Sequence, residues 1–552
     1  MQLLQHFKEL TLRPKNAQEL KGLILELALR GRLTNNFSLN RQKNQNDIVQ
    51  GYYKLPRDWY WDKFDNISNF QMGKTPPSKE MEYWEGIHPW ISIADMATYS
   101  TITHTKKTLS DKGLNNYFKN GLVKKGTLLM SFKLTIGKTS ILGVDACHNE
   151  AIISIYPKEK VLQKYLFLFL PVISHWGVQV NALMGKTLNK GKIQNMNIPI
   201  PPLEEQKEIV KVVETLFKEV EQLEHLTVAR IGLKEDFVSS ALQQLTTNST
   251  NQEEWINLQE HFKSFFNETT NIKKLRETIL QLAVQGKLTR AFRESHPELV
   301  SGLHHASNLL KRIQKEKAQL IKDKKIKNEK ALPPITEDEI PYELPEGWVW
   351  CRLGTVTDII AGASFKSGDF NKTEGVKCIK ITNAGVRSFV ETNDYLPKDF
   401  DKLHPSYLIK EGDLILALTR PYIKDGLKIS ICPSTYNNSL LNQRVASIRS
   451  MTSGIYHPYI FTFIQTPKVL NYYKSKFDDK SQQPNMKMGD ITDLPISLPP
   501  LEEQKAIVEK VNALMGLCDA LEQEVQQSQQ HSEMMMQSVL KEVFEGRKEV
   551  AN

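Results

Sequence analysis

PPLEEQK stands at residues 201–207 and again at residues 499–505. Beyond each copy, apolar residues continue at matching positions between charged ones. These positions are Ile209, Val213, Leu216, Val220 and Leu223 after the first copy, and Ile507, Val511, Leu514, Cys518 and Leu521 after the second. Paired prolines followed by acidic residues are typical of a helix start, where the helix dipole favours negative charge. Each copy therefore predicts the beginning of a long, charged, amphipathic helix.

Two further pairs of segments extend the repeat. Residues 20–34 (LKGLILELALRGRLT) resemble residues 275–289 (LRETILQLAVQGKLT). Residues 55–61 (LPRDWYW) resemble residues 344–350 (LPEGWVW) in the same way. The order of short helix, globular region and long helix thus occurs twice, which indicates tandem duplication of one structural unit.

The regions between these helices, residues 52–200 and 342–498, are rich in short apolar runs separated by turn residues. Examples are TLLMSF (127–132), AIISIY (151–156), DLILAL (413–418) and RVASIR (444–449). Such runs favour strands. Between shared frame residues the two regions differ, as expected where one scaffold displays two different binding surfaces. The predicted fold class is α+β: two α/β domains separated by a pair of long helices, with internal pseudo-two-fold symmetry.

The apolar residues of the two long helices follow one another at spacings of 4, 3, 4 and 3, which is the seam of a coiled coil. Because the helices are copies with the same seam, we expect them to pair antiparallel. The alternative is one packed face of an ordinary helical bundle. A segment of about 22 residues spans about 33 Å, which is close to one turn of B-DNA.

Composition excludes several classes of protein. The 552 residues include 72 Lys and Arg against 63 Asp and Glu, a formal charge of +9 that permits a polyanionic partner. Apolar stretches are too short to span a membrane, and no secretory signal is visible, so we expect a cytoplasmic protein. The five cysteines form no CxxC pair, which supports neither a disulfide framework nor a zinc site. Residues 311–330 carry nine basic and three acidic side chains and represent either a solvated helix face or a phosphate or partner contact.

Catalytic motifs are missing from the sequence. Three GKT triplets, at residues 73–75, 137–139 and 185–187, lack the upstream glycine that a phosphate-binding loop requires. His304 and His305 have no acidic or cysteine companion at ligand spacing, so no metal site is expected. Paired acids such as Glu204 and Glu205 are explained by solvation of a helix surface. We therefore expect no catalysis by this chain alone and no cofactor bound to it.

The helical motifs resemble a known family. PLEEQK, LRETILQLAVQGKLT and ALPPITEDEIPYELPEGWVW (331–350) are similar to conserved regions of specificity subunits of type I restriction-modification systems. The resemblance implies two target recognition domains, each contacting one half of a bipartite, asymmetric DNA sequence. It also implies two modification subunits as partners, which carry S-adenosylmethionine and methylate adenine, and restriction subunits that can join them.

The resemblance divides the chain into five regions. They are an N-terminal conserved helical segment (1–50), target recognition domain 1 (51–200), a central conserved region with the long helix, a second helix and the basic linker (201–341), target recognition domain 2 (342–498), and a C-terminal conserved long helix (499–552).

Candidate DNA contacts follow from side-chain chemistry, because Arg, Lys, Asn, Gln, Ser and Thr bind base edges and phosphates. In the first domain they are Lys74, Lys79, Ser131, Lys133, Lys138, Thr139, Asn149, Lys186 and Lys190. In the second domain they are Lys366, Lys380, Asn383, Thr419, Arg420, Lys424, Asn442, Gln443, Arg444 and Lys487. Lys133 and Thr419 follow equivalent predicted strands, and Asn149 aligns with Asn442. For each candidate the alternative is an ordinary polar loop residue.

Two other functions remain open at this point. One is a free-standing nuclease or methyltransferase with unrecognised motifs, which would bind S-adenosylmethionine without a partner. The other is a protein–protein scaffold with no role in DNA binding.

Overall fold

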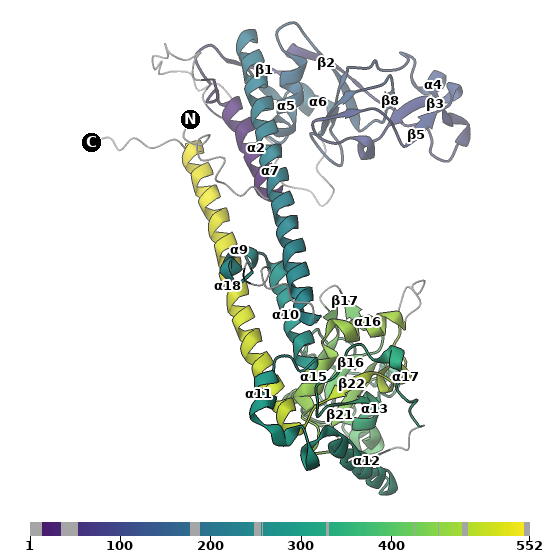
Figure 1. Ribbon diagram of the computed structural model, residues 1–552. Helices are drawn as coiled ribbons and strands as arrows, with labels where there is room; N and C mark the ends of the chain where they lie inside the picture. Colours follow the sequence, from purple (N-terminus) through teal and green to yellow (C-terminus); the bar gives the residue numbers. More distant parts are fainter. Residues whose placement is uncertain are drawn as a thin grey trace. The chain divides into compact units, whose positions relative to one another are not determined.

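The computed structural model describes residues 14–34, 53, 55–176, 188–247, 256, 258–326, 331–423, 426–450, 452–476 and 484–545. The chain divides into two units (Figure 1). Unit 1 comprises residues 1–232 and 532–552, and unit 2 comprises residues 233–531. The first long helix, α7 (Leu203–Thr246), begins in unit 1 and ends in unit 2, whereas the second, α18 (Leu501–Glu545), begins in unit 2 and ends in unit 1.

Unit 1 contains a five-stranded sheet in the order β2-β9-β6-β7-β4 and a three-stranded sheet in the order β5-β3-β8. The strands of the larger sheet are β2 (Ser68–Met72), β9 (Ile152–Pro157), β6 (Leu128–Ser131), β7 (Thr139–Leu142) and β4 (Ser100–Ile102). Those of the smaller sheet are β5 (Lys107–Leu109), β3 (Trp84–Ile91) and β8 (Cys147–His148). The helices are α2 (Pro14–Leu29), α3 (Phe64–Ile67), α4 (Asp111–Tyr117), α5 (Gln163–Ile173) and α6 (Lys190–Gln194).

Unit 2 repeats this plan with two four-stranded sheets and a short hairpin. The sheets run β12-β21-β16-β19 and β14-β13-β20-β15. The strands of the first are β12 (Thr357–Ala361), β21 (Val445–Ser450), β16 (Leu414–Ala417) and β19 (Ile429–Ile431). Those of the second are β14 (Tyr395–Leu396), β13 (Val376–Ile379), β20 (Ser439–Leu441) and β15 (Leu408–Ile409), and the hairpin is β17 (Tyr422–Ile423) with β18 (Gly426–Leu427).

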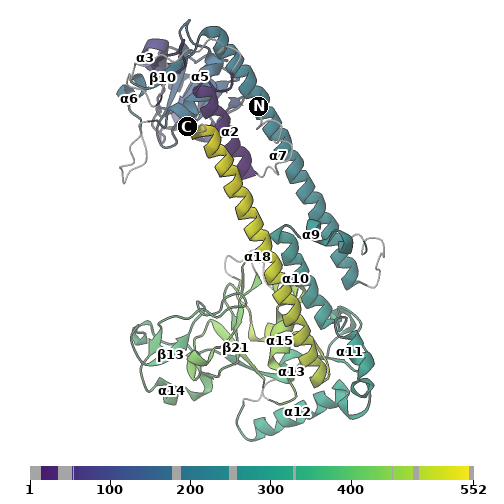
Figure 2. The same ribbon diagram turned by 90° about the vertical axis from the view of Figure 1, so that its left-hand side faces the viewer.

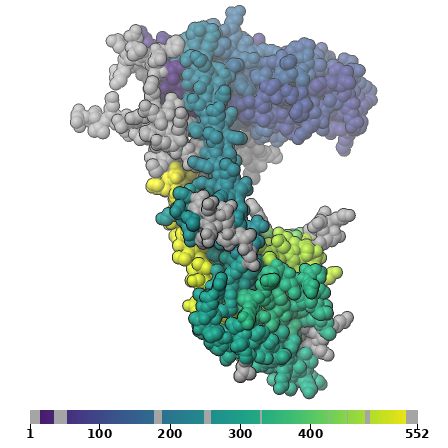
Figure 3. Space-filling model, in the orientation of Figure 1, coloured from purple at the N-terminus to yellow at the C-terminus, as the bar shows by residue number. Residues whose placement is uncertain are grey.

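The residues of unit 2 form the teal and green part of the surface in Figure 3, and the unit also contains short helices. They are α9 (Phe262–Phe265), α10 (Thr269–Val284), α11 (Arg290–Ser295), α12 (Ala306–Lys322), α13 (Leu353–Val356), α14 (Phe400–Leu403), α15 (His457–Ile464), α16 (Pro467–Ser475) and α17 (Met488–Thr492). The two α/β domains and the long helices confirm the predicted fold class.

In each unit a pair of antiparallel strands joins the α/β domain to the helices. Strand β1 (Tyr60–Lys63) pairs with β10 (Asn197–Ile200), and β11 (Val349–Arg352) pairs with β22 (Pro495–Leu498). The first strand of each pair opens its domain and the second closes it. The long helix begins within three residues of the closing strand in both units.

The apolar seam of each long helix is buried inside one unit. Ile209, Val213 and Val220 of α7 belong to the core that contains the leucines of α2. Ile507 and Val511 of α18 belong to the core that contains α10. Figure 2 shows α10 beside α18, and Arg276 of α10 pairs there with Asp519 and Glu522. Within each unit the seam thus packs as a face of a helical bundle, the alternative that the spacing left open.

Equivalent ion pairs join the short and long helices. Lys21 of α2 pairs with Glu221 of α7 at 2.7 Å, and at the matching positions Arg276 pairs with Asp519 at 2.6 Å. The duplication seen in the sequence therefore extends to individual side-chain contacts.

Candidate nucleic-acid interface

A buried cluster of polar side chains, the junction cluster, fixes the start of each long helix. In unit 1, Glu205 accepts hydrogen bonds from Thr34 Oγ1 and Trp59 Nε1, both at 2.9 Å. In unit 2, Glu503 accepts equivalent bonds from Thr289 Oγ1 and Trp348 Nε1, both at 2.7 Å, and also pairs with Arg293. The sequence suggested a solvated acid at position 205, but Glu205 is only 5% exposed. That prediction was wrong for Glu205, because the tryptophan of the LPxxW segment supplies a buried donor.

The loops that follow β6 and β16 are the strongest candidates for binding surfaces. Leu134 in the first loop is 83% exposed with a φ of 63°, and Arg420 at the equivalent position has a φ of 48°. Residues other than glycine rarely adopt this left-handed conformation, which is concentrated at functional sites. Lys133 adjoins the first tip and Thr419 adjoins the second, in agreement with their predicted equivalence.

A close backbone approach brings further candidates together. The backbone N–H of Lys74 donates to the His148 carbonyl at 3.0 Å, which places Lys74 near Asn149. Gly73 permits this contact, because a Cβ there would lie 1.9 Å from the His148 carbonyl oxygen. In unit 2, Gly362 has the same role beside Asn442, where a Cβ would lie 2.0 Å from the carbonyl oxygen.

In the second domain, the segments of Arg420 and Arg444 lie side by side. The backbone N–H of Leu418 donates to the Arg444 carbonyl at 2.9 Å, and both arginine side chains are exposed. Gln443 is also exposed. This edge of the sheet therefore presents two guanidinium groups and one amide, which are suitable for base edges and phosphates.

Three candidates are buried and have partners within the chain. Ser131 Oγ donates to the Thr135 carbonyl and accepts from the Lys138 N–H, which shapes the β6–β7 loop. Thr139 donates to the Phe167 carbonyl, and the Asn383 amide donates to Val390 and Thr392. These side chains position the loops from inside.

The remaining candidates differ in their surroundings. Lys138 donates to the Met96 carbonyl at 3.1 Å, and Lys380 pairs with Asp394 at 3.0 Å. The exposed ones are Lys74, Lys79, Lys190, Lys366 and Lys487. Lys186 and Lys424 lie outside the described residues.

The basic segment 311–330 is represented by α12 and the turn that follows it, as far as residue 326. Leu309 and Ile313 of α12 are buried, and Lys317 donates to the carbonyls of Gly354 and Thr357. One face of α12 thus packs on the second domain, and most of its other cations remain at the surface. His305 Nδ1 accepts from the Ser307 N–H at the start of this helix.

Within the described part of the chain, no group of three or more His, Cys, Asp or Glu side chains is arranged to hold a metal ion. No helix among those residues is both long enough and apolar enough to cross a membrane. All five cysteines are buried free thiols.

Comparison with known proteins identifies the class to which this duplicated α/β architecture belongs. Residues 56–229 and 345–529 match the family described as the type I restriction modification DNA specificity domain. The match covers both α/β domains and more than half of the chain, so the chain belongs to this family. It is a specificity subunit of a type I restriction-modification system.

Curated relatives extend over nearly the whole chain. The EcoAI specificity subunit of Escherichia coli is 28% identical over 91% of this chain and 90% of its own length. The MjaVIII specificity subunit of Methanocaldococcus jannaschii is 24% identical over 88% of this chain and 93% of its own length. A solved chain from work on complex assembly and conformational transition of the type I R-M system aligns with a TM-score of 0.50 and 16% identity. It covers 90% of this chain and 99% of that chain, and supports the fold.

Proposed function

We propose that the domains of residues 51–200 and 342–498 each recognise one half of a bipartite, asymmetric DNA target. The observation that carries this proposal is that the two domains have equivalent internal structures but different surface residues. Three residues of the junction cluster, a threonine, a tryptophan and a glutamate, match between the units, whereas Lys133 and Leu134 in the first domain stand where Thr419 and Arg420 stand in the second. Two domains that share a fold but expose different side chains are expected to bind two different half-sites.

The proposed contacts are the candidates that are exposed or half-buried at the surface of the two domains. In the first domain they are Lys74, Lys79, Lys133, Asn149 and Lys190, and in the second Lys366, Thr419, Arg420, Asn442, Gln443, Arg444 and Lys487. Arginine and asparagine bind guanine and adenine edges in a bidentate manner, and lysines bind phosphates. Ser131, Thr139 and Asn383 would support these loops from inside.

The helical parts would set the spacer between the half-sites and bind two adenine-methyltransferase subunits. Support comes from the equivalent helix pairs of the two units, α2 with α7 and α10 with α18, since two similar surfaces suit two copies of one partner. S-adenosylmethionine would be bound by those partners, which must extract adenine from the base stack. Restriction subunits would join the same assembly, and this chain alone would catalyse nothing.

Gel shifts with and without a co-expressed methyltransferase subunit test the proposal. We expect a sequence-selective complex whose affinity falls steeply with salt. Sequencing of methylated genomic DNA should then show an asymmetric motif with an unspecified spacer. Tight binding of S-adenosylmethionine to the purified chain would instead favour a free-standing enzyme. Absence of any selective DNA complex would favour a protein scaffold.

A further inference from the structure

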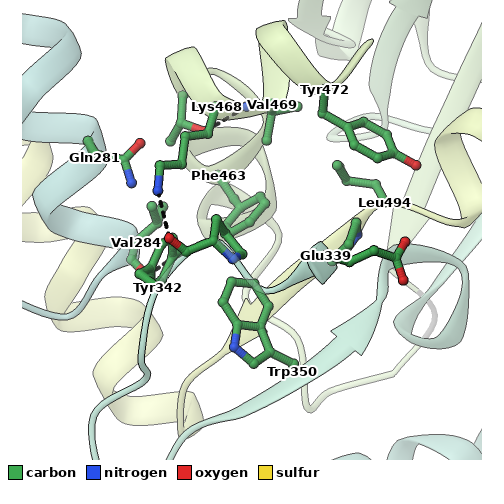
Figure 4. Close-up of a pocket in the computed structure, with 13 residues that line it drawn as sticks. Gln281, Val284, Glu339, Tyr342, Trp350, Phe463, Lys468, Val469, Tyr472 and Leu494 are labelled. Carbon is green, nitrogen blue, oxygen red and sulfur yellow. Dashed lines mark hydrogen bonds between the residues drawn. The ribbon is translucent and has the colours of Figure 1, made fainter. Parts of the chain in front are cut away.

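A pocket of about 120 Å³ opens in unit 2 between α10, α15, α16 and the β11–β22 strand pair. Apolar groups of Val284, Trp350, Phe463, Tyr472 and Leu494 line it (Figure 4). An apolar cavity of about 150 Å³ is large enough to bind benzene. The pocket therefore has about the size of one aromatic ring.

Two hydrogen-bond donors stand at one side of this pocket. Gln281 is only 6% exposed, and its amide nitrogen has no hydrogen-bond partner in the structure. Figure 4 shows this amide pointing toward the Lys468 amine, which lies 4.7 Å from the Tyr342 ring centroid. Lys468 donates one bond to the Pro341 carbonyl at 3.2 Å, and burial lowers its pKa. A buried donor without a partner is costly, so this side of the pocket is suited to an acceptor oxygen.

In unit 1, a tryptophan side chain occupies the space beside the two aromatic rings that are equivalent to Tyr342 and Trp350. Tyr53 and Trp61 occupy the positions of Tyr342 and Trp350, and each tyrosine donates to a carbonyl at the end of its short helix, Leu29 in unit 1 and Val284 in unit 2. In unit 1 the indole of Trp176 packs edge-on against both rings, with centroid distances of 5.8 and 6.2 Å. The equivalent rings in unit 2, 5.0 Å apart, adjoin the open pocket instead.

We propose that the unit 2 pocket binds the six-membered ring of one indole side chain, whose remaining part lies at the open mouth, from an extended segment of the modification subunit. A peptide carbonyl of that segment accepts a hydrogen bond from Gln281 Nε2. This inference rests on the proposed function, which supplies the partner. None of the residues that line the pocket is a candidate DNA contact, which favours a protein partner. The apolar space suits the ring of an aromatic side chain, and the donors beside it suit the backbone carbonyl of the same segment. The binding site is confined to unit 2, since Trp176 fills the equivalent position in unit 1.

The test uses the full chain labelled with 5-fluorotryptophan and N-acetyl-L-tryptophan amide as the probe. The chain has eight tryptophans, and the variants Trp350→Phe and Trp61→Phe assign the two fluorine resonances that the test compares. We expect a saturable shift of the Trp350 signal and no shift of the Trp61 signal. Gln281→Leu should weaken probe binding about five-fold, the effect of one lost hydrogen bond. Lys468→Met gives a second variant that does not alter α10.

The matched control is Glu26→Leu, because Glu26 occupies the position of Gln281 in unit 1. It should leave the Trp350 response unchanged. An unshifted Trp350 signal at saturating probe, or equal binding by wild type and Gln281→Leu, would overturn the pocket as a site for this chemistry.

Addition of the unlabelled modification subunit should move the Trp350 signal in the same direction as the probe, and the probe should then no longer bind. If the subunits assemble and methylate DNA selectively while Trp350 stays unshifted, the pocket inference fails and the proposed function stands. If no assembly or selective methylation occurs, the proposed function fails. Binding of the probe to the chain alone then still tests whether the pocket accepts an indole ring.

Discussion

Trp348 donates its indole N–H to the carboxylate of Glu503 at 2.7 Å, and both side chains are buried. Trp348 comes directly before the strand that opens the second domain, and Glu503 lies in the first turn of α18. One hydrogen bond thus connects the domain to the helix that carries it. Trp59 and Glu205 repeat the arrangement in unit 1 at 2.9 Å.

Removal of the Glu503 carboxylate should destabilise unit 2. We expect Glu503→Ala to lower its free energy of unfolding by about 3 kcal/mol, because Arg293 and Trp348 would lose their buried acceptor. Hydrogen exchange of α18 amides in urea measures the change. The neighbouring Glu502→Ala is the control, since Glu502 forms an exposed pair with Lys505 whose loss should cost under about 1 kcal/mol. Equal effects of the two variants would contradict a role for the junction cluster.

His148 should make the first domain sensitive to acid. Burial lowers the pKa of His148 to about 4, below the ordinary value of 6.5. Between these values the unfolded chain binds a proton that the folded domain does not, so stability falls as pH decreases from about 6.5 to about 4. His148→Leu, which copies Leu441 at the equivalent position of unit 2, should remove that dependence. Urea unfolding at several pH values provides the measurement, and an unchanged slope in the variant would refute the assignment to His148.

Arg420 and Arg444 should act on one half-site only. We expect each change to alanine to weaken binding by about 1–3 kcal/mol and to relax base preference in the half-site bound by the second domain. Binding to duplex libraries with one randomised half-site distinguishes the two halves. Lys74→Ala is the matched variant in the first domain and should affect the other half-site. Equal losses at both half-sites would contradict the division of recognition between the domains.

Lengthening both long helices should change the preferred spacer. Seven residues inserted after Gly232 in α7 and after His531 in α18 would add about 10 Å to each helix, the rise of about three base pairs. We expect a correspondingly longer spacer with unchanged half-sites, measured by selection from a library of spacer lengths. Insertion into one helix alone serves as the control and should weaken binding to every spacer. An identical spacer preference in the doubly lengthened protein would rule out the helices as its determinant.

Most of the fold could be predicted because the chain is duplicated, so that its two halves can be aligned with each other. PPLEEQK predicted the start of α7 and α18, and the repeated LPxxW segments indicated equivalent positions in the two units, where the structure has the strands β1 and β11. The environment of Glu205 could not be predicted, because helical periodicity alone does not show that Trp59 donates into that turn. The tryptophans repeated before each domain were a signal that an acceptor is buried nearby.

The candidate site was harder to predict, because chemistry alone does not separate a surface side chain from a buried one. Asn383 and Arg420 were equally plausible contacts in sequence, yet the first forms hydrogen bonds inside a turn and the second stands exposed at a loop tip. The conformation of Leu134 gave no sequence signal, since leucine is not a residue that turn patterns single out. Such distinctions depend on long-range strand pairing.

The antiparallel pairs β1–β10 and β11–β22 place the first and last residues of each α/β domain next to each other. A domain whose first and last residues are neighbours can be replaced by a related domain without changing the positions of the chain segments that flank it. Exchange of such cassettes between related genes would create new sequence preferences in one step, while the helices and their assembly surfaces stay as they are.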